Sequence, residues 1–290
     1  MEVKKLVVLD KNDFNEQQKQ ELKNLAKEVV IYEDTPKDDE EAIKRIKDAD
    51  AVIVCWYSLN EKCIDACDNL RYLGIVATGY GWLSAEYATK KGVIVTNVPG
   101  YSTKAVSSFI FKQLENFNLT NKTIGIVGLG KIGYKVAEIA KQKGLNVIYW
   151  NRTPKKTEFK SAGFNEIFKK ADIIVLQVKS CEETKSIIKN KNLEDLKEGA
   201  IIVNVVSPKL FEEEDYLINL IKKKNLKLIL DFEEKSRLAD TAKTNKAILY
   251  TGGIAWKSDE SIFNLHQIAI ENLKSYKKEK IQNKLETVGS

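Results

Sequence analysis

The sequence predicts two α/β domains, each built around a parallel sheet that helices cover on both faces. Its 290 residues exceed the usual size of a single core. The strand-like segments are short and apolar at nearly every position, and helical patterns separate them, as expected for doubly wound parallel sheets. Pro99 and Gly100 interrupt this alternation and indicate a crossing between domains. We therefore assign residues 1–98 and 258–290 to one domain and residues 99–257 to the other.

The first domain alternates strand and helix patterns with short connections between them. Apolar runs predict strands, and segments that are apolar on one helical face predict helices. The expected strands are residues 5–9, 29–32, 51–56, 72–77 and 93–96. The expected helices are residues 13–26 and 40–47, a short helix from Glu61, and residues 84–91.

The second domain repeats the pattern after a helix expected from about residue 102 to 116. Its expected strands are residues 124–127, 146–150, 173–178, 201–206, 226–230 and 247–250. A long amphipathic segment, residues 258–280, closes the chain. We expect this segment to form a helix that returns to pack on the first domain.

Composition and charge narrow the class of protein. Lysine and arginine exceed aspartate and glutamate by 47 to 41, but the charges are interspersed, so we expect no nucleic-acid partner. The expected partner is a small-molecule substrate. No apolar run is long enough to cross a bilayer and the first residues predict a strand, so we expect a cytoplasmic protein without membrane contact. Cys55, Cys63, Cys67 and Cys181 lack CxxC spacing. We expect buried free thiols and no metal site.

The strongest motif is a glycine-rich turn between a buried strand and a helix. It reads Gly128-Leu129-Gly130-Lys131-Ile132-Gly133, a GxGxxG pattern. The glycines permit a tight turn and let the backbone approach a pyrophosphate, while the helix N-terminus supplies N–H donors. In this strand-turn-helix context the motif predicts dinucleotide binding through Gly128, Gly130, Lys131, Ile132 and Gly133.

The strand after this motif ends without the acidic residue that an NAD-binding unit places on the ribose hydroxyls. It ends instead in Asn151, Arg152 and Thr153, with Lys155 and Lys156 just beyond. Arginine pairs well with phosphate, so this segment favours NADP, through a site for the 2′-phosphate. NAD remains possible, because a solvated basic loop is the alternative interpretation.

Several blocks together resemble the D-isomer-specific 2-hydroxyacid dehydrogenase family, which includes glycerate, glyoxylate and phosphoglycerate dehydrogenases. The resemblance runs in register from roughly Leu6 to Tyr276. The matching blocks are residues 70–79, 92–100, 128–133, 171–174, 183–184 and 196–204. The resemblance implies a flavodoxin-like substrate domain and a Rossmann dinucleotide-binding domain, with a homodimer formed through the latter.

The family reduces 2-oxo acids with an arginine that holds the substrate and a histidine–glutamate pair that supplies a proton. Here the family arginine position is Ser207, the glutamate position is Ser236, and the histidine position is Gly253. Glu233 or Glu234 could replace the glutamate only if the loop is shortened. The chain's one histidine, His266, lies on the terminal segment, where we expect a satisfied histidine and no catalyst.

Two further family positions also differ. Ser108 stands where the family commonly has an acid, and Gln177 begins the segment where it has a proline.

Two hypotheses of different class follow. The first is an NADP-preferring oxidoreductase with an atypical active site, whose substrate lacks a carboxylate or arrives protonated, as an imine does. The residues expected to line the substrate cleft are Tyr57, Gly79, Tyr80, Tyr101 and Lys104. The side chains of the three tyrosines and of the lysine could then serve as other proton donors. The second is a non-catalytic NADP-binding sensor or scaffold of the same fold. Ordinary 2-hydroxyacid reduction would require a different register around Ser236 and Gly253.

Overall fold

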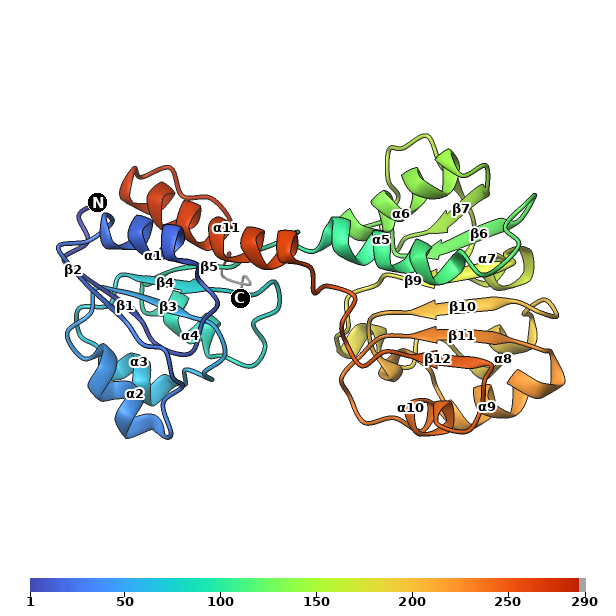
Figure 1. Ribbon diagram of the computed structural model, residues 1–290, viewed down its shortest axis with the longest axis horizontal. Helices are drawn as coiled ribbons and strands as arrows, with labels where there is room; N and C mark the ends of the chain where they lie inside the picture. The colour runs from blue at the N-terminus through green and yellow to red at the C-terminus, as the bar shows by residue number, and fades with distance from the viewer. Residues whose placement is uncertain (287–290) are drawn as a thin grey trace. The chain divides into compact units, whose positions relative to one another are not determined.

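The computed structural model describes residues 1–286 and divides into two compact units (Figure 1). Unit 1 comprises Met1–Tyr101 together with the chain from Ser258 onward, and unit 2 comprises Ser102–Lys257. Each unit contains one sheet whose named strands pair with one another in parallel. The predicted fold class is therefore confirmed.

Unit 1 has the strand order β2-β1-β3-β4-β5. The strands are β1 (Lys5–Val8), β2 (Glu28–Ile31), β3 (Ala51–Val54), β4 (Tyr72–Ile75) and β5 (Ile94–Thr96). The helices are α1 (Glu16–Lys23), α2 (Asp39–Ile46), α3 (Glu61–Asp65), α4 (Ala85–Lys90) and α11 (Asp259–Lys277). In this order the sheet reverses its winding between β1 and β3, as in a flavodoxin-like fold.

Two apolar layers cover the sheet of unit 1. One layer joins Val7, Val52 and Leu73 to residues of α2, α3 and α4. The other joins Leu6 and Ile53 to α1 and to the apolar face of α11, and Figure 1 shows α11 lying beside α1. The terminal helix therefore completes the core of the unit that the N-terminal strands begin.

Unit 2 has the strand order β12-β11-β10-β9-β6-β7-β8. The strands are β6 (Thr123–Val127), β7 (Asn146–Trp150), β8 (Lys160–Ser161), β9 (Ile173–Leu176), β10 (Ile201–Asn204), β11 (Lys227–Leu230) and β12 (Ile248–Tyr250). The sequence did not predict β8, because two exposed residues show no apolar pattern. The other six strands are confirmed.

Helices cover both faces of this second sheet. They are α5 (Thr103–Leu114), α6 (Lys131–Gln142), α7 (Phe164–Lys170), α8 (Asn190–Glu194), α9 (Glu214–Lys223) and α10 (Arg237–Ala242). Ile124 and Ile126 of β6 pack with α5 and α6, whereas Val127 packs with α7 to α10. The alternation along β6 thus divides the core between two helical layers.

The cysteines divide into two environments. Cys55, Cys63 and Cys67 are buried, as expected, but Cys181 is partly exposed. It precedes the short helix η1 (Glu182–Thr184), where its backbone N–H donates to Oγ1 of Thr184, so the expectation of a buried thiol is wrong there. Among residues 1–286 no His, Cys, Asp and Glu cluster could hold a metal ion, and no helix is long and apolar enough to cross a membrane.

His266 is a satisfied core histidine, as expected. Its side chain lies on α11 and is 3% exposed. Nδ1 lies 2.8 Å from the carbonyl oxygen of Ile262, and Nε2 accepts from the Asp13 N–H at 3.4 Å. The ring also makes an edge contact with Phe14. Burial lowers the pKa of His266 below its usual 6.5.

The lowered pKa of His266 should make the folded protein less stable as the pH falls. As pH drops below 6.5, the unfolded chain takes up a proton before the folded chain does, so stability present above that pH is progressively lost. We expect the free energy of unfolding to decrease more between about pH 7.5 and about pH 5.5 in the wild type than in His266→Gln. Urea unfolding at both pH values measures this difference, and parallel losses in the two proteins would contradict it.

Candidate functional site

The candidate site is the carboxyl edge of the sheet in unit 2. Because all its strands run in parallel, the turns that follow β6, β7, β9, β10, β11 and β12 meet at this edge. The order reverses between β6 and β9, which is where open α/β sheets bind ligands. Every cofactor and catalytic position considered from the sequence in this unit lies in one of these turns or in the helix start that follows it.

The glycine-rich turn after β6 requires glycine at two positions for steric reasons. Gly128 has a φ of +103°, and a Cβ there would lie 2.7 Å from backbone atoms of Gln177. A Cβ on Gly133 would lie 2.1 Å from the carbonyl oxygen of Gly128. Gly130 has open space within 4 Å of its Cβ position. The turn is therefore tightly packed on its inner side and open at Gly130.

This open side fits a dinucleotide pyrophosphate. Gly130 is the N-cap of α6 and forms no side-chain cap, so the first-turn N–H groups of the helix face outward with the positive end of its dipole. An anion at this position would satisfy these donors. A second donor lies at the same edge, since Nε2 of Gln177 is buried without a partner among the described residues. The donor set matches the cofactor that the motif predicts.

The turn after β7 gives Asn151 a structural role that the sequence did not reveal. Its Oδ1 accepts from the Leu129 N–H at 2.9 Å, and its Nδ2 donates to the Thr153 carbonyl at 2.7 Å. Asn151 thus ties the glycine-rich turn to the end of β7. Arg152 and Thr153 are exposed beside it, and no carboxylate follows β7 directly.

Arg152 also lies within electrostatic reach of Glu183. The pKa of Glu183 is lowered, first by its hydrogen bonds with the Cys181 side chain and with backbone, and to a smaller extent by the charges of Arg152 and Lys179. These charges lie in the turns after β7 and β9, on adjoining parts of the edge. A phosphate bound by Arg152 would therefore compete with an exposed carboxylate.

Ser207, at the family arginine position, is a buried cap. It is 0% exposed, and its Oγ accepts from the Lys209 N–H in the short helix η2 (Pro208–Leu210). Its Oγ also donates to Oε1 of Glu234 at 2.8 Å. The residue that the sequence aligns with the family arginine is therefore a neutral hydroxyl bound to a carboxylate.

Ser236, at the family glutamate position, is likewise a helix cap. Its Oγ accepts from the N–H groups of Leu238 and Ala239 at the start of α10, and donates to Glu214 on α9. Capping of this kind stabilises a helix and leaves no free acid. Ser236 therefore explains the local fold better than it explains any chemistry.

The glycine pair after β12 forms a turn around a carboxylate that sequence reasoning missed. Gly252 and Gly253 have φ values of +75° and +80°, which residues with a Cβ rarely adopt. The Gly253 and Ile254 N–H groups donate to Oδ1 of Asp231 at 2.9 and 2.8 Å, and the Ala255 N–H donates to Oδ2 at 2.7 Å. The glycines therefore let successive backbone donors converge on Asp231.

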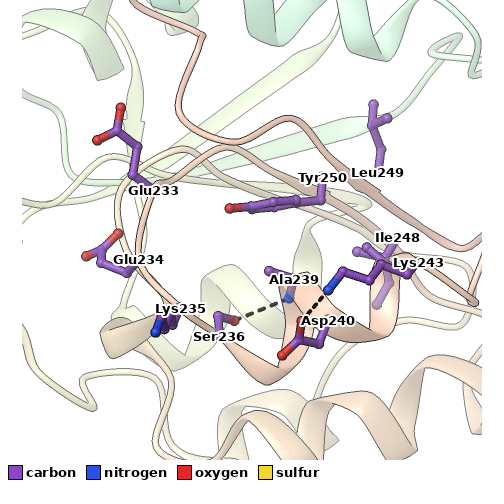
Figure 2. A pocket seen from close by; sticks show the side chains of 11 residues that line it. Glu233, Glu234, Lys235, Ser236, Ala239, Asp240, Lys243, Ile248, Leu249 and Tyr250 are labelled. Carbon is purple, nitrogen blue, oxygen red and sulfur yellow. Dashed lines mark hydrogen bonds and ion pairs between the residues drawn. The ribbon is translucent and has the colours of Figure 1, made fainter.

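Glu233 occupies the space that a side chain at Gly253 would need. A Cβ built on Gly253 would lie 2.5 Å from Cγ of Glu233 and 3.3 Å from its Cδ. Glu233 and Glu234 follow β11 and line a pocket of about 680 Å³ (Figure 2). The loop thus presents two carboxylates beside Ser207 and Gly253 without any shortening.

The expected cleft residues lie in both units. Tyr57 follows β3 and its OH donates to Oδ1 of Asp39 at 2.7 Å; burial first, and then this bond, raise the pKa of Tyr57. Gly79 and Tyr80 follow β4, and Gly79 accepts from the Trp82 indole. Burial raises the pKa of Tyr101 to about 12. Lys104 is exposed in the first turn of α5. Their role in substrate binding stays a prediction.

The Asp231 turn should be a measurable source of stability. Asp231→Asn replaces one acceptor oxygen with a donor that faces backbone N–H groups, and an unsatisfied buried donor costs about 2–3 kcal/mol. We expect a loss of that size in urea unfolding. Asp240→Asn is the matched control, because its partner Lys243 is exposed and such pairs contribute about 0–1 kcal/mol. Equal stability of both variants would contradict this role.

Comparisons with known proteins agree with this geometry. The model of the NAD binding domain of the D-isomer specific 2-hydroxyacid dehydrogenases matches residues 98–251. Hydroxypyruvate reductase of Blautia hydrogenotrophica is 28% identical over 288 residues, which covers 87% of this chain and 89% of that protein.

Two solved structures have the same fold over nearly the whole chain. One is the acyclic imino acid reductase Bsp5 in complex with NADPH and D-Arg, with a TM-score of 0.85, 26% identity, and coverage of 97% of this chain and 100% of that chain. The other is the NAD+-bound 3-phosphoglycerate dehydrogenase of Entamoeba histolytica, with a TM-score of 0.81, 24% identity, and coverage of 99% of both chains. This chain belongs to the D-isomer specific 2-hydroxyacid dehydrogenase family, whose members are nicotinamide-dependent oxidoreductases with a Rossmann NAD-binding domain.

Proposed function

We propose that this protein is an NADP-preferring reductase with an atypical active site, and that its substrate is an imine in place of a 2-oxo acid. The observation that carries the proposal is a contrast at the carboxyl edge of the sheet, between the turn expected to bind the cofactor and the positions expected to act on the substrate. The glycine-rich turn keeps the geometry that a dinucleotide needs, whereas the positions aligned with the family's cation and acid hold a buried hydroxyl and a glycine at positive φ.

The chemistry follows from what these positions lack. The bound nicotinamide would supply a hydride. A 2-oxo acid would then also need a cation for its carboxylate and a proton for its oxygen, and Ser207 and Gly253 provide neither. A protonated imine already carries its proton on nitrogen, so its reduction does not require a protein acid. The site therefore suits C=N reduction better than C=O reduction.

The preference for NADP rests on the turn after β7. Three basic side chains are exposed there, those of Arg152, Lys155 and Lys156. The acidic side chain that binds the ribose hydroxyls in NAD-binding units is absent from this turn. The similarity to an imino acid reductase solved with NADPH supports both the cofactor and the class of substrate. We also propose that the protein is a homodimer, by analogy with the family, and that it is cytoplasmic, because no apolar run is long enough to cross a bilayer.

NADPH consumption by the purified protein tests the function. We expect turnover with cyclic imines that lack a carboxylate to exceed turnover with 2-oxo acids and aldehydes, and we expect slower turnover with NADH. Absorbance at the nicotinamide band measures the rate. Tight NADPH binding without turnover of any substrate would favour the non-catalytic sensor or scaffold instead. Rapid glyoxylate reduction without imine reduction would contradict the proposal.

Arg152→Ala tests the cofactor preference. A charge-assisted hydrogen bond to phosphate contributes about 1.5–3 kcal/mol, so the variant should bind NADPH about 10-fold to 100-fold more weakly. NADH binding should change less than about 2-fold, since NADH has no 2′-phosphate. Fluorescence titration gives both constants. Arg152→Lys should recover part of the loss, and equal losses for both cofactors would remove the argument for a 2′-phosphate site.

A further inference from the structure

We propose that Glu233, supported by Glu234, makes the carboxyl edge of unit 2 selective for a cationic substrate group, the protonated C=N of an iminium. This inference rests on the proposed function and deepens it, because it names the charge that the substrate must carry. The site is the same carboxyl edge of the sheet in unit 2 that holds the glycine-rich turn.

The first observation is the contact between Glu233 and Gly253. The Glu233 Cγ lies 2.5 Å from where a Gly253 Cβ would stand, and its Cδ and Oε1 lie 3.3 Å from that point. A histidine at Gly253 would therefore clash with Glu233 and would also need a φ near +80°. The Glu233 side chain therefore fills the space in which a side chain at residue 253 would begin, and it brings a carboxylate there.

The second observation is independent and lies on the neighbouring strand. Ser207 is fully buried after β10, and its hydroxyl donates to Oε1 of Glu234 at 2.8 Å. This bond holds the Glu234 carboxylate against the residue that the sequence aligns with the family arginine. A carboxylate thus lies beside the position where the resemblance implies a cation.

The third observation is that the two carboxylates are not neutralised. Among residues 1–286 neither Glu233 nor Glu234 has an ion-pair partner within 4.0 Å. Of the two lysines lining the same pocket, Lys243 pairs with Asp240 at 2.8 Å and Lys235 is exposed. In Figure 2 both glutamates project from one stretch of loop, apart from the Asp240–Lys243 pair. The loop therefore presents two carboxylates that have no direct ion-pair partner among the described residues.

Such charge discriminates between substrates. A nearby carboxylate favours the protonated form of an imine and disfavours a second carboxylate, so it attracts an iminium and repels a 2-oxo acid. The step balances without a protein acid. A hydride from NADPH forms the new C–H bond, the C=N π pair moves to nitrogen, and the products are a neutral amine and NADP+. Glu233 accordingly acts on substrate choice and on the protonation of the bound imine.

Three planar probes of matched shape test this charge selectivity without turnover. Acetamidinium is a permanent C=N cation at neutral pH, acetamide is its neutral counterpart, and acetate is the anion. Competition or calorimetry on the NADP+-loaded protein gives their affinities. We expect acetamidinium to bind at least about tenfold more tightly than acetamide, with acetate the weakest. In Glu233→Gln this preference should fall about tenfold, with NADPH affinity unchanged.

Two further variants control the result. Glu234→Gln keeps an acceptor for Ser207 and should also weaken the preference. Glu138→Gln removes a half-exposed charge on α6, which pairs with Lys135, and should leave the preference intact. Equal binding of the three probes, or a preference that survives in Glu233→Gln, would overturn the inference.

Turnover separates this inference from the proposed function. Imine reduction by a wild-type protein without cation preference would keep the function and overturn the inference. A cation preference that depends on Glu233, in a protein that reduces no substrate, would support the charge selectivity and overturn the function.

Discussion

The site depends on the parallel register of the sheet in unit 2, which makes its strands end level with one another. Val127 pairs with Leu176, Leu176 with Asn204, Asn204 with Leu230, and Leu230 with Tyr250. Each of these residues ends its strand, so the next residues of all five strands turn at the same height. This row places the glycine-rich turn, Ser207, the Glu233 loop and Gly253 at one edge, although they are far apart in the sequence.

The absence of a histidine at residue 253 is linked to the backbone conformation and not only to one side chain. Asp231 requires the N–H groups of Gly253, Ile254 and Ala255 to point toward it, and the positive φ values of the glycine pair provide that conformation. A residue with a Cβ would be strained there, and it would displace Glu233. The carboxylate loop and the glycine turn therefore specify each other, and a single substitution cannot restore the family's acid.

The sequence alone was enough to predict the architecture and the cofactor turn. Apolar strands and a GxGxxG motif depend on local patterns, and both are visible without a partner. The roles of Asn151, Asp231 and Glu233 were not predictable, because each depends on which atoms a neighbouring strand end brings near it. The expectation that Ser207 stands at the family arginine position likewise did not reveal that its hydroxyl donates to Glu234. The sequence shows that no arginine stands at residue 207, and only the tertiary contact shows that a glutamate carboxylate lies beside that residue.

The carboxylates also bear on the choice between an enzyme and a sensor. A protein that only binds NADP needs the glycine-rich turn and a phosphate site, and neither involves Glu233 or Glu234. Adjacent like charges without a cationic partner repel one another and lower stability. Proteins generally retain such local conflicts at functional sites. A cationic substrate would offset the repulsion at this edge, whereas a cofactor sensor gives the two glutamates no role, so the arrangement favours an enzyme whose ligand brings the missing positive charge.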